Sequence, residues 1–419
     1  MKLALYHPWI YLRGGIERSI LQLVNHSRHS WTIYTGRYDR DHTFSEFRSL
    51  DIRELNRTSV DRSYAGVLGS SIQVLRQKLP LDDNTDAIVV WCDGIGDLIV
   101  FRNKSLPLFN ICSTPLRAAF DPVYERLALR QRGLAERVAY MVLKHGFRAI
   151  DRLAWRNYTG VICTSTEVKN RIVQGGLCSD QRRMAMAYPG IKWNPDTSGA
   201  EYQPFILLAG RIMWTKNVQQ AIRAFLRAAL PPPWRLVIAG FVDGKSAEYL
   251  SQMQMLAGSN EWIEFVISPT DRQLIELYRT AVFCLFTPLN EDWGIVALEA
   301  MAAGKAVIAL ARGGPKESVV DGQTGILLDR DDDEQWANAI RKLCLTPGLA
   351  REMGINAHRH ASRYTEEQFA RTVDDAVERW MTIYRSKGRA SNIQCPSERS
   401  LKRSLQGPAT ENLPKLSHD

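Results

Sequence analysis

The sequence lacks the features that would mark it as secreted, membrane-spanning or nucleic-acid-binding. No apolar run approaches the roughly 20 residues of a membrane-spanning helix, and the apolar start of the chain, interrupted by His7 and Pro8, is too short for a secretory signal. Seven scattered cysteines contain no Cys-x-x-Cys pair, so neither a disulfide framework nor a zinc site is indicated. Helix-turn-helix, zinc-finger and RNP-like patterns are absent, so nucleic acid is not expected as a partner. We expect a cytoplasmic protein, either soluble or resting on a membrane surface.

Length and composition indicate a large globular chain. At roughly 150 residues per domain, 419 residues suggest two to three domains. Hydrophobic residues make up 45% of the chain and charged residues 24%, which suits folded cores. The net charge of +9 suits an anionic ligand, an anionic membrane or nucleic acid equally well, so charge alone does not decide the partner.

Short apolar runs alternate with amphipathic segments along most of the chain. Such alternation predicts an α/β fold with parallel sheets. The polar, turn-rich segment 192–203 is typical of an interdomain linker. The predicted organisation is a Rossmann-like domain over 1–195, a second over 203–365, a helix over 366–385 that crosses back to the first domain, and a disordered tail over 386–419.

The most informative segment runs from 282 to 314. A strand, a loop, a short buried helix over 293–303 and a second strand form a βαβ unit, so the loop lies where open α/β sheets bind ligands. Glu291 lies in that loop. Glu299 is surrounded by apolar residues inside the helix, so its charge needs a hydroxyl-bearing ligand or a cation of the protein as partner. A surface helix with a solvated glutamate is the alternative interpretation.

The two glutamates, with seven residues between them, resemble the E-x7-E motif of retaining glycosyltransferases of family 4. Trp293-Gly294 after the first glutamate and the Gly-Gly-Pro-x-Glu segment from Gly313 to Glu317 extend the resemblance. It implies the GT-B fold, in which two Rossmann-like domains face each other across a central cleft. In that family the first glutamate contacts donor sugar hydroxyls and the second contacts the nucleotide ribose. By resemblance, the donor-binding residues of this unit are Glu291, Asp292, Trp293, Gly294, Ile295 and Glu299.

Three other segments match the donor site of the same family. Gly210-Arg211 followed by Lys216 resembles its Gly-Arg-x4-Lys segment, whose cations grip the donor pyrophosphate and stabilise the departing nucleoside diphosphate without a metal. Gly14-Gly15 precede a helix after the first strand and form a natural phosphate site, with an ordinary tight turn as the alternative. The backbone at Ile267 is where this fold holds the base edge. The implied catalytic residues are Glu291, Arg211 and Lys216, and no metal cofactor is expected.

The segment from Cys112 to Arg117 resembles the C-H-T-P-x-R loop of a mannosyltransferase branch of the family, but Ser113 stands where histidine is expected. In the family that histidine helps to hold the donor sugar. Asp93, Ser113 and Arg117 are the acceptor-side candidates, although a turn or cap role is the simpler interpretation of Asp93.

The implied reaction is retaining transfer of a hexose, preferably mannose from GDP-mannose, to a hydroxyl of a glycan or lipid-linked acceptor in surface polysaccharide or glycolipid synthesis. The alternatives are a transferase using UDP-glucose or another nucleotide-sugar, a sugar-nucleotide epimerase, and a non-catalytic anion-binding protein on the same fold.

A helix predicted over 124–155 carries a basic stripe, which suggests contact with a phosphate-bearing acceptor or with anionic lipid on the inner face of the membrane. A solvated helix face is the alternative. The residues of this basic stripe are Arg126, Arg130, Arg137, Lys144 and Arg148.

Overall fold

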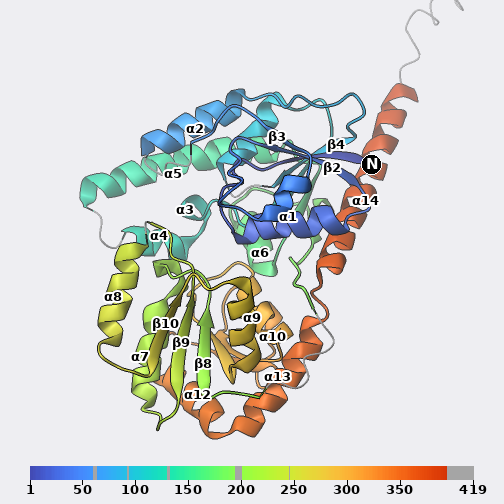
Figure 1. Ribbon diagram of the computed structural model, residues 1–419. Helices are drawn as coiled ribbons and strands as arrows, with labels where there is room; N and C mark the ends of the chain where they lie inside the picture. The colour runs from blue at the N-terminus through green and yellow to red at the C-terminus, as the bar shows by residue number, and fades with distance from the viewer. Residues whose placement is uncertain (60–63, 92–93, 130–132, 194–200, 245, 394–419) are drawn as a thin grey trace, which may run out of the picture.

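The computed structural model describes residues 1–59, 64–91, 94–129, 133–193, 201–244 and 246–393 (Figure 1). Within these residues, each half of the chain forms one parallel sheet, in the order β3-β2-β1-β4-β5-β6-β7 and β10-β9-β8-β11-β12-β13. The first sheet contains β1 (Lys2–Tyr6), β2 (Ser30–Thr35), β3 (Ile52–Glu54), β4 (Ala87–Trp91), β5 (Leu108–Cys112), β6 (Gly160–Cys163) and β7 (Met184–Met186). The second contains β8 (Phe205–Ala209), β9 (Arg235–Gly240), β10 (Ile263–Ile267), β11 (Phe283–Phe286), β12 (Ala306–Leu310) and β13 (Gly325–Leu328).

Helices cover both faces of each sheet, and the central strands are buried along their whole length. Every residue of β4, β5 and β12 is buried, as expected for parallel strands enclosed on two sides. In the N-terminal half the helices are α1 (Gly15–His26), α2 (Tyr64–Arg76), α3 (Arg117–Phe120), α4 (Pro122–Leu129), α5 (Leu134–Trp155) and α6 (Thr166–Gln174). In the C-terminal half they are α7 (Val218–Ala228), α8 (Ala247–Ala257), α9 (Asp271–Thr280), α10 (Ile295–Ala302), α11 (Pro315–Ser318), α12 (Asp333–Leu345) and α13 (Pro347–Ala361).

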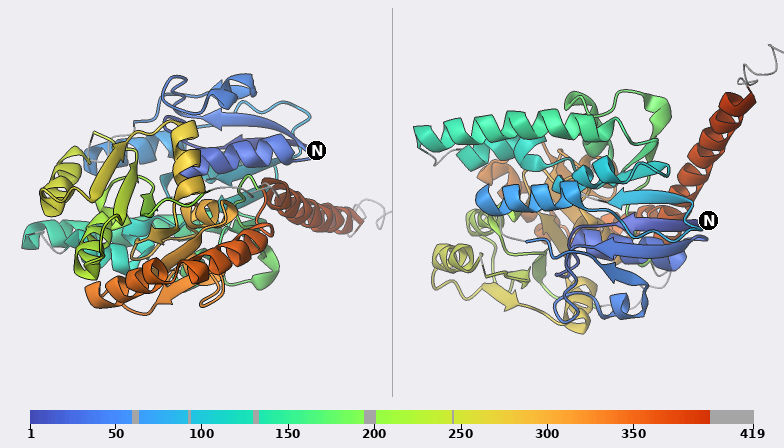
Figure 2. Two further views of the ribbon diagram at one scale, coloured as in Figure 1. Left: turned by 60° about the horizontal axis from the view of Figure 1, so that its bottom comes forward. Right: turned by 90° about the horizontal axis from the view of Figure 1, so that it is seen from above.

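The last helix, α14 (Glu366–Ile393), lies against the N-terminal domain although it follows the second sheet in sequence (Figures 1 and 2). Phe369 and Trp380 are buried with residues of α1 and the first sheet, and Trp380 stacks on Phe109 of β5 with ring centroids 5.7 Å apart. The helix continues to Ile393, so the prediction of disorder from residue 386 is wrong for its first residues. The rest of that segment and most of the predicted linker lie outside the described residues.

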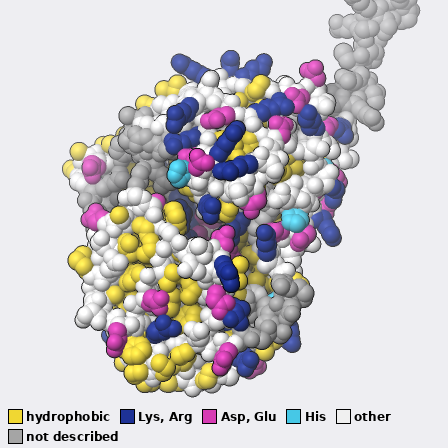
Figure 3. All heavy atoms as spheres, viewed as in Figure 1, with side chains coloured by type: hydrophobic (Ala, Val, Ile, Leu, Met, Phe, Trp, Pro, Cys, Tyr) yellow, Lys and Arg dark blue, Asp and Glu magenta, His cyan; other side chains and the backbone are white. Residues whose placement is uncertain are grey.

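The predicted fold class is confirmed: two Rossmann-like domains with parallel sheets face each other. On the face shown in Figure 3, the surface is hollowed between them, and basic side chains gather on the upper, N-terminal domain. No helix in the described part of the chain combines the length and apolar character needed to cross a membrane. The described cysteines are buried free thiols, as expected: Cys112, Cys163, Cys178, Cys284 and Cys344.

One predicted helix needs correction, and one observed helix was not predicted. The helix predicted over 124–155 is two helices, α4 and α5, and Gly133 precedes the first residue of α5 with an extended backbone. Glycine has no side chain to cap or pack at that position. The apolar periodicity of the sequence therefore continues across Gly133, although the helix does not. Helix α13 was not predicted at all, although Pro347 stands at its first turn, where proline favours a helix start.

Candidate functional site

The loop between β11 and α10 is shaped by glycines packed against its backbone. Gly294 precedes α10 with φ +83°, and a side chain there would meet the ring of Phe286. A Cβ on Gly313 would overlap the carbonyl oxygen of Glu291, and one on Gly314 that of Trp293. Gly314 also donates its backbone N–H to the Glu291 carbonyl at 2.8 Å. Glycine is therefore required at these positions to hold the loop at the head of α10.

Glu291 and Lys216 form the centre of the candidate donor site. Lys216 Nζ lies 2.7 Å from Glu291 Oε2, and both side chains are about three-quarters buried, with 22% and 24% exposure. Burial alone would raise the pKa of Glu291, but Lys216, Arg117 and Arg211 outweigh it, so this pKa lies below its ordinary value. Glu291 is therefore ionised at neutral pH and able to accept hydrogen bonds from hydroxyl groups.

The two predicted pyrophosphate cations lie in one short segment after β8. Lys216 ends a single turn of 3-10 helix, η4 (Trp214–Lys216), and Asn217 follows in the left-handed region with φ +52° before α7 begins. The backbone carbonyl of Lys216 accepts a hydrogen bond from the Thr287 hydroxyl, which fixes Lys216 to the end of β11. Arg211 is exposed, and it lies near enough to Glu291 to lower the pKa of that carboxyl. Both cations thus lower the pKa of the same carboxylate, and their contact with the donor pyrophosphate stays a prediction.

Glu299 has the protein cation that its apolar surroundings demand. Arg18 Nη1, from α1 of the facing domain, makes a short ion pair with Oε1, and the Tyr278 hydroxyl donates to Oε2 at 3.3 Å. Burial raises the pKa of Glu299, and Arg18 partly offsets this effect. The two glutamates of the motif therefore differ electrostatically: Glu291 is held charged by three nearby cations, while Glu299 depends mainly on one.

Trp293 is the donor-site prediction that the structure changes most. Its side chain is buried, stacks on Tyr188 with centroids 4.6 Å apart, and donates its indole N–H to the Pro189 carbonyl at 2.9 Å. It therefore packs between the domains, and only its backbone is left for a ligand. The neighbouring Ile295 begins α10 and packs on the apolar core of the C-terminal domain.

The glycine turn lies at the start of α1 and the base-edge position at the end of β10. Gly14 and Gly15 precede and begin α1, and a side chain on Gly14 would overlap the Glu17 carboxylate, which occupies the turn. Glu17 thus complements the start of the helix. Ile267 ends β10, with its side chain 41% exposed at the carboxyl edge of the second sheet.

The acceptor-side predictions have separate outcomes. Asp93 lies outside the described residues. Ser113 accepts the indole N–H of Trp91 at 2.8 Å, so its hydroxyl ties two strands of the first sheet together. Arg117 crosses the cleft and donates to Asp292 from Nη2 at 2.7 Å. Asp292, predicted to bind the donor, is thus held by the facing domain.

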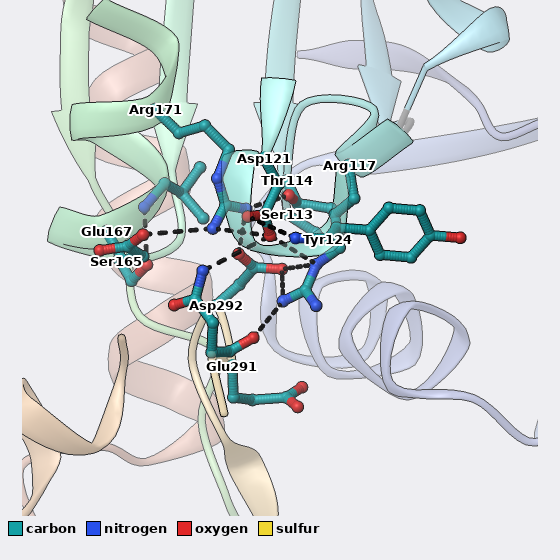
Figure 4. A network of polar contacts seen from close by, with 12 residues as sticks. Ser113, Thr114, Arg117, Asp121, Tyr124, Ser165, Glu167, Arg171, Glu291 and Asp292 are labelled. Atoms are coloured by element: carbon teal, nitrogen blue, oxygen red, sulfur yellow. Dashed lines mark hydrogen bonds and ion pairs between the residues drawn. The ribbon is translucent and has the colours of Figure 1, made fainter. Parts of the chain in front are cut away.

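Two residues that take part in the contact between Arg117 and Asp292 were not predicted from the sequence. Arg171 on α6 also binds Asp292, and Asp121 lies 3.5 Å from Arg171 and 4.0 Å from Arg117 (Figure 4). A single arginine within a helix and an aspartate before a proline carry no distinctive sequence signal, because both are common at solvated positions. Their function depends on a residue more than 100 positions away in sequence.

The predicted basic stripe does not form one free face. Arg130 lies outside the described residues, Lys144 pairs with Glu125 at 2.6 Å, and the Arg148 guanidinium lies over the Phe120 ring. Arg126 and Arg137 are exposed, on different helices. The stripe prediction fails because it assumed one continuous helix.

Comparisons with known proteins place this chain among glycosyltransferase-like sequences. Residues 192–360 match the family model described as Glycosyl transferases group 1. The chain is 25% identical to the alpha-1,3/1,6-mannosyltransferase alg-2 of Neurospora crassa over 89% of both proteins. It is 28% identical to a D-inositol 3-phosphate glycosyltransferase of Corynebacterium urealyticum, over 50% of this chain and 54% of that protein. The chain spans about half or less of the length of the inositol phosphate glycosyltransferases it matches.

Solved structures show the same architecture. Anabaena Alr3699/HepE, in complex with UDP and glucose, superimposes with a TM-score of 0.67 at 17% identity, over 90% of this chain and 99% of that one. WaaG, a glycosyltransferase involved in lipopolysaccharide biosynthesis, gives 0.64 at 18% identity, over 89% and 98%. The chain has the GT-B fold. Its C-terminal half is similar to group 1 glycosyltransferase domains, and the resemblance to GT4-like glycosyltransferases is confirmed.

Proposed function

We propose that this protein is a retaining glycosyltransferase that moves a hexose, preferably mannose from GDP-mannose, to a hydroxyl of a glycan or lipid-linked acceptor. The observation that carries the proposal is the contact between Glu291 and Lys216 at the head of α10, with Arg211 beside it. A carboxylate held ionised can bind sugar hydroxyls, while two cations receive the charge of the departing diphosphate. The similarity to alpha-1,3/1,6-mannosyltransferases over 89% of the chain favours mannose.

In the proposed mechanism the protein supplies positions and charge. Arg211 and Lys216 bind the pyrophosphate, and their positive charge stabilises the negative charge that grows on the leaving oxygen. Glu291 orients the sugar through its hydroxyl groups. The leaving phosphate oxygen accepts the proton of the acceptor hydroxyl on the same face of the sugar, so the configuration at the anomeric carbon is retained without a protein nucleophile.

A panel of nucleotide-sugars tests the proposal. We expect release of nucleoside diphosphate from GDP-mannose in preference to UDP-glucose, with a hexose joined to the acceptor or to water. Preferred turnover of UDP-glucose would keep the class and change the sugar. An epimerised nucleotide-sugar without diphosphate release would identify an epimerase, and binding without any turnover would identify a non-catalytic protein.

We expect turnover to continue without a divalent metal ion. The reason is that Arg211, Lys216 and the start of α10 already supply a positive field at the diphosphate. The measurement is the initial rate of diphosphate release after dialysis against EDTA, compared with the same protein supplemented with Mg²⁺ or Mn²⁺. Abolition by EDTA and full recovery with either metal would contradict the prediction.

We further propose that the protein binds an anionic membrane surface, with α5 as the contacting element. This helix exposes apolar side chains that a solvated helix would normally bury: Leu134 at 81%, Val138 at 56% and Val142 at 67%. They recur every four residues and so share one face, and the exposed Arg137 lies beside them. An apolar stripe with adjacent cations is the pattern of an interfacial helix.

Replacing both Leu134 and Val142 with aspartate should weaken binding to anionic liposomes at least about tenfold. The reason is that two apolar side chains that would enter the membrane surface are lost. Charge reversal of Arg126 and Arg137 should weaken it less, by about 1 kcal/mol for each cation. Co-sedimentation at low salt measures both effects, with calorimetric GDP binding as the control for an intact donor site. If the wild-type protein does not bind anionic liposomes, α5 has another role.

A further inference from the structure

The two domains meet through a buried cluster of charges beside the donor loop. Asp292 accepts hydrogen bonds from Arg117 of α3, at 3.0 Å from Nε and 2.7 Å from Nη2, and from Nη1 of Arg171 on α6. Asp121 completes the cluster, with Oδ2 3.5 Å from Arg171 Nη2. The side chains of Arg171 and Asp121 are only 4% and 2% exposed. We name these four residues the interdomain clasp.

The charges of the interdomain clasp neutralise one another only while the two domains are in contact. Its two arginines face two aspartates, and three of the four residues belong to the N-terminal domain. Removal of Asp292 would leave two enclosed guanidinium groups against one aspartate of the cluster and the partly exposed Glu167. Losing one partner of a buried charge cluster is strongly unfavourable. The cluster therefore favours the arrangement in which the donor loop contacts the N-terminal domain.

The interdomain clasp also fixes the backbone around Glu291. Arg117 donates to the carbonyl oxygen of Asn290 at 2.8 Å as well as to the Asp292 carboxylate. Figure 4 shows that the Glu291 side chain points away from this network, toward the opposite side of the loop. The residues on either side of Glu291 are thus tied to the segment that carries Ser113 and Arg117.

Helix α6 makes a second contact with the C-terminal domain. Its first backbone N–H, from Thr166, donates to both carboxylate oxygens of Glu317 at 2.8 and 3.0 Å, and Glu167 adds a third bond at 3.3 Å. A carboxylate at a helix N-terminus is favoured by the helix dipole. Because α6 also carries Arg171, these amides report on the same domain contact without touching Asp292.

We propose that the interdomain clasp positions Glu291 and its bound sugar against the acceptor-side segment 113–121, with Arg171 as a positioning residue. The expected effect on transfer rate rests on the proposed function. The expected effect on the contact between the domains does not. The nucleotide contacts proposed for Arg211, Lys216 and Glu299 lie in the C-terminal domain, so binding of a free nucleoside diphosphate should depend little on the clasp. Transfer requires both domains in register and should depend on it.

The structural test is hydrogen exchange at the amides of Thr166 and Glu167 in the full chain. Asp292→Asn should speed exchange there at least tenfold, while amides of β9 in the C-terminal core keep their wild-type rates. Arg117→Gln, at a side chain that is 22% exposed, should act in the same direction and serves if Asp292→Asn does not fold. Glu276→Gln, which breaks an exposed pair with Arg279, is the matched control and should change nothing. Unchanged exchange at Thr166 and Glu167 in both test variants would overturn the clasp.

The kinetic test separates positioning from donor binding. In Asp292→Asn and Arg171→Gln, calorimetric Kd values for GDP and UDP should stay within twofold, while kcat with GDP-mannose or UDP-glucose falls at least tenfold. The double variant should be little worse than either single variant, since both break one cluster. A rise in donor KM with kcat unchanged would overturn the positioning role. If the wild-type protein turns over no nucleotide-sugar, the proposed function fails, and the exchange experiment alone decides whether the clasp exists.

Discussion

Arg211→Ala and Lys216→Met are each expected to cost about 2–4 kcal/mol of transition-state stabilisation, a fall in kcat/KM of roughly 30-fold to 1,000-fold. The departing nucleoside diphosphate gains negative charge, and these two side chains are cations of the C-terminal domain that lower the pKa of Glu291. Lys216 is only 22% exposed, so water replaces it poorly. Diphosphate release at varied donor concentration gives the measurement.

Lys216→Met carries a second signature in its pH dependence. Lys216 is the strongest of the cations that lower the pKa of Glu291, so its removal lets burial raise that pKa. A raised pKa means that the carboxylate is lost earlier as pH falls. The acid limb of the kcat/KM profile should therefore move to higher pH in the variant, whereas a variant that only loosens diphosphate binding would keep the wild-type limb.

Lys342→Met is the matched control for this prediction. Lys342 is exposed in the last turn of α12 in the same domain, and its replacement should change kcat/KM and stability little. Thermal unfolding of all variants separates lost folding from lost chemistry. Near-normal kcat/KM in a well-folded Arg211→Ala variant would remove that arginine from the site.

Glu291→Gln and Glu299→Gln are expected to fail in different ways. Glu291 faces the group that is transferred, so its loss should chiefly lower kcat, by about 100-fold, and leave nucleotide binding within a few-fold. Glu299 lies eight positions further along the chain and faces Arg18 and Tyr278. Its proposed ligand is the ribose, which does not react, so its loss should chiefly weaken nucleotide binding, by about tenfold.

Calorimetry with free GDP distinguishes the two glutamates without any acceptor. Each Gln variant keeps the size of the side chain and removes only the charge, so differences in packing are small. Glu299→Gln also removes the partner of Arg18, and its melting temperature must accompany the binding data. If Glu291→Gln abolishes GDP binding while Glu299→Gln leaves it intact, the assigned roles are reversed.

Much of the donor half was predictable because its signals are local. The strands around Glu291 are continuous apolar runs, and the glycines at 294, 313 and 314 mark turns that only glycine can form against neighbouring backbone. The need of Glu299 for a cation followed from its apolar neighbours in sequence. One local error had a local cause: Gly133 separates two helices whose apolar patterns continue across it in the sequence.

By itself the sequence determined the α/β class, the two-domain plan and the position of the donor loop, since hydrophobic periodicity and turn residues act over short stretches of chain. Only the tertiary structure decided which groups meet across the cleft. Arg18 reaches Glu299 over 281 positions and Arg171 reaches Asp292 over 121, and no spacing rule connects them. Such pairs depend on how two separately folded sheets are placed against each other. That placement is set by buried charge, by the Tyr188–Trp293 stack and by the return of α14, none of which is encoded in a local pattern.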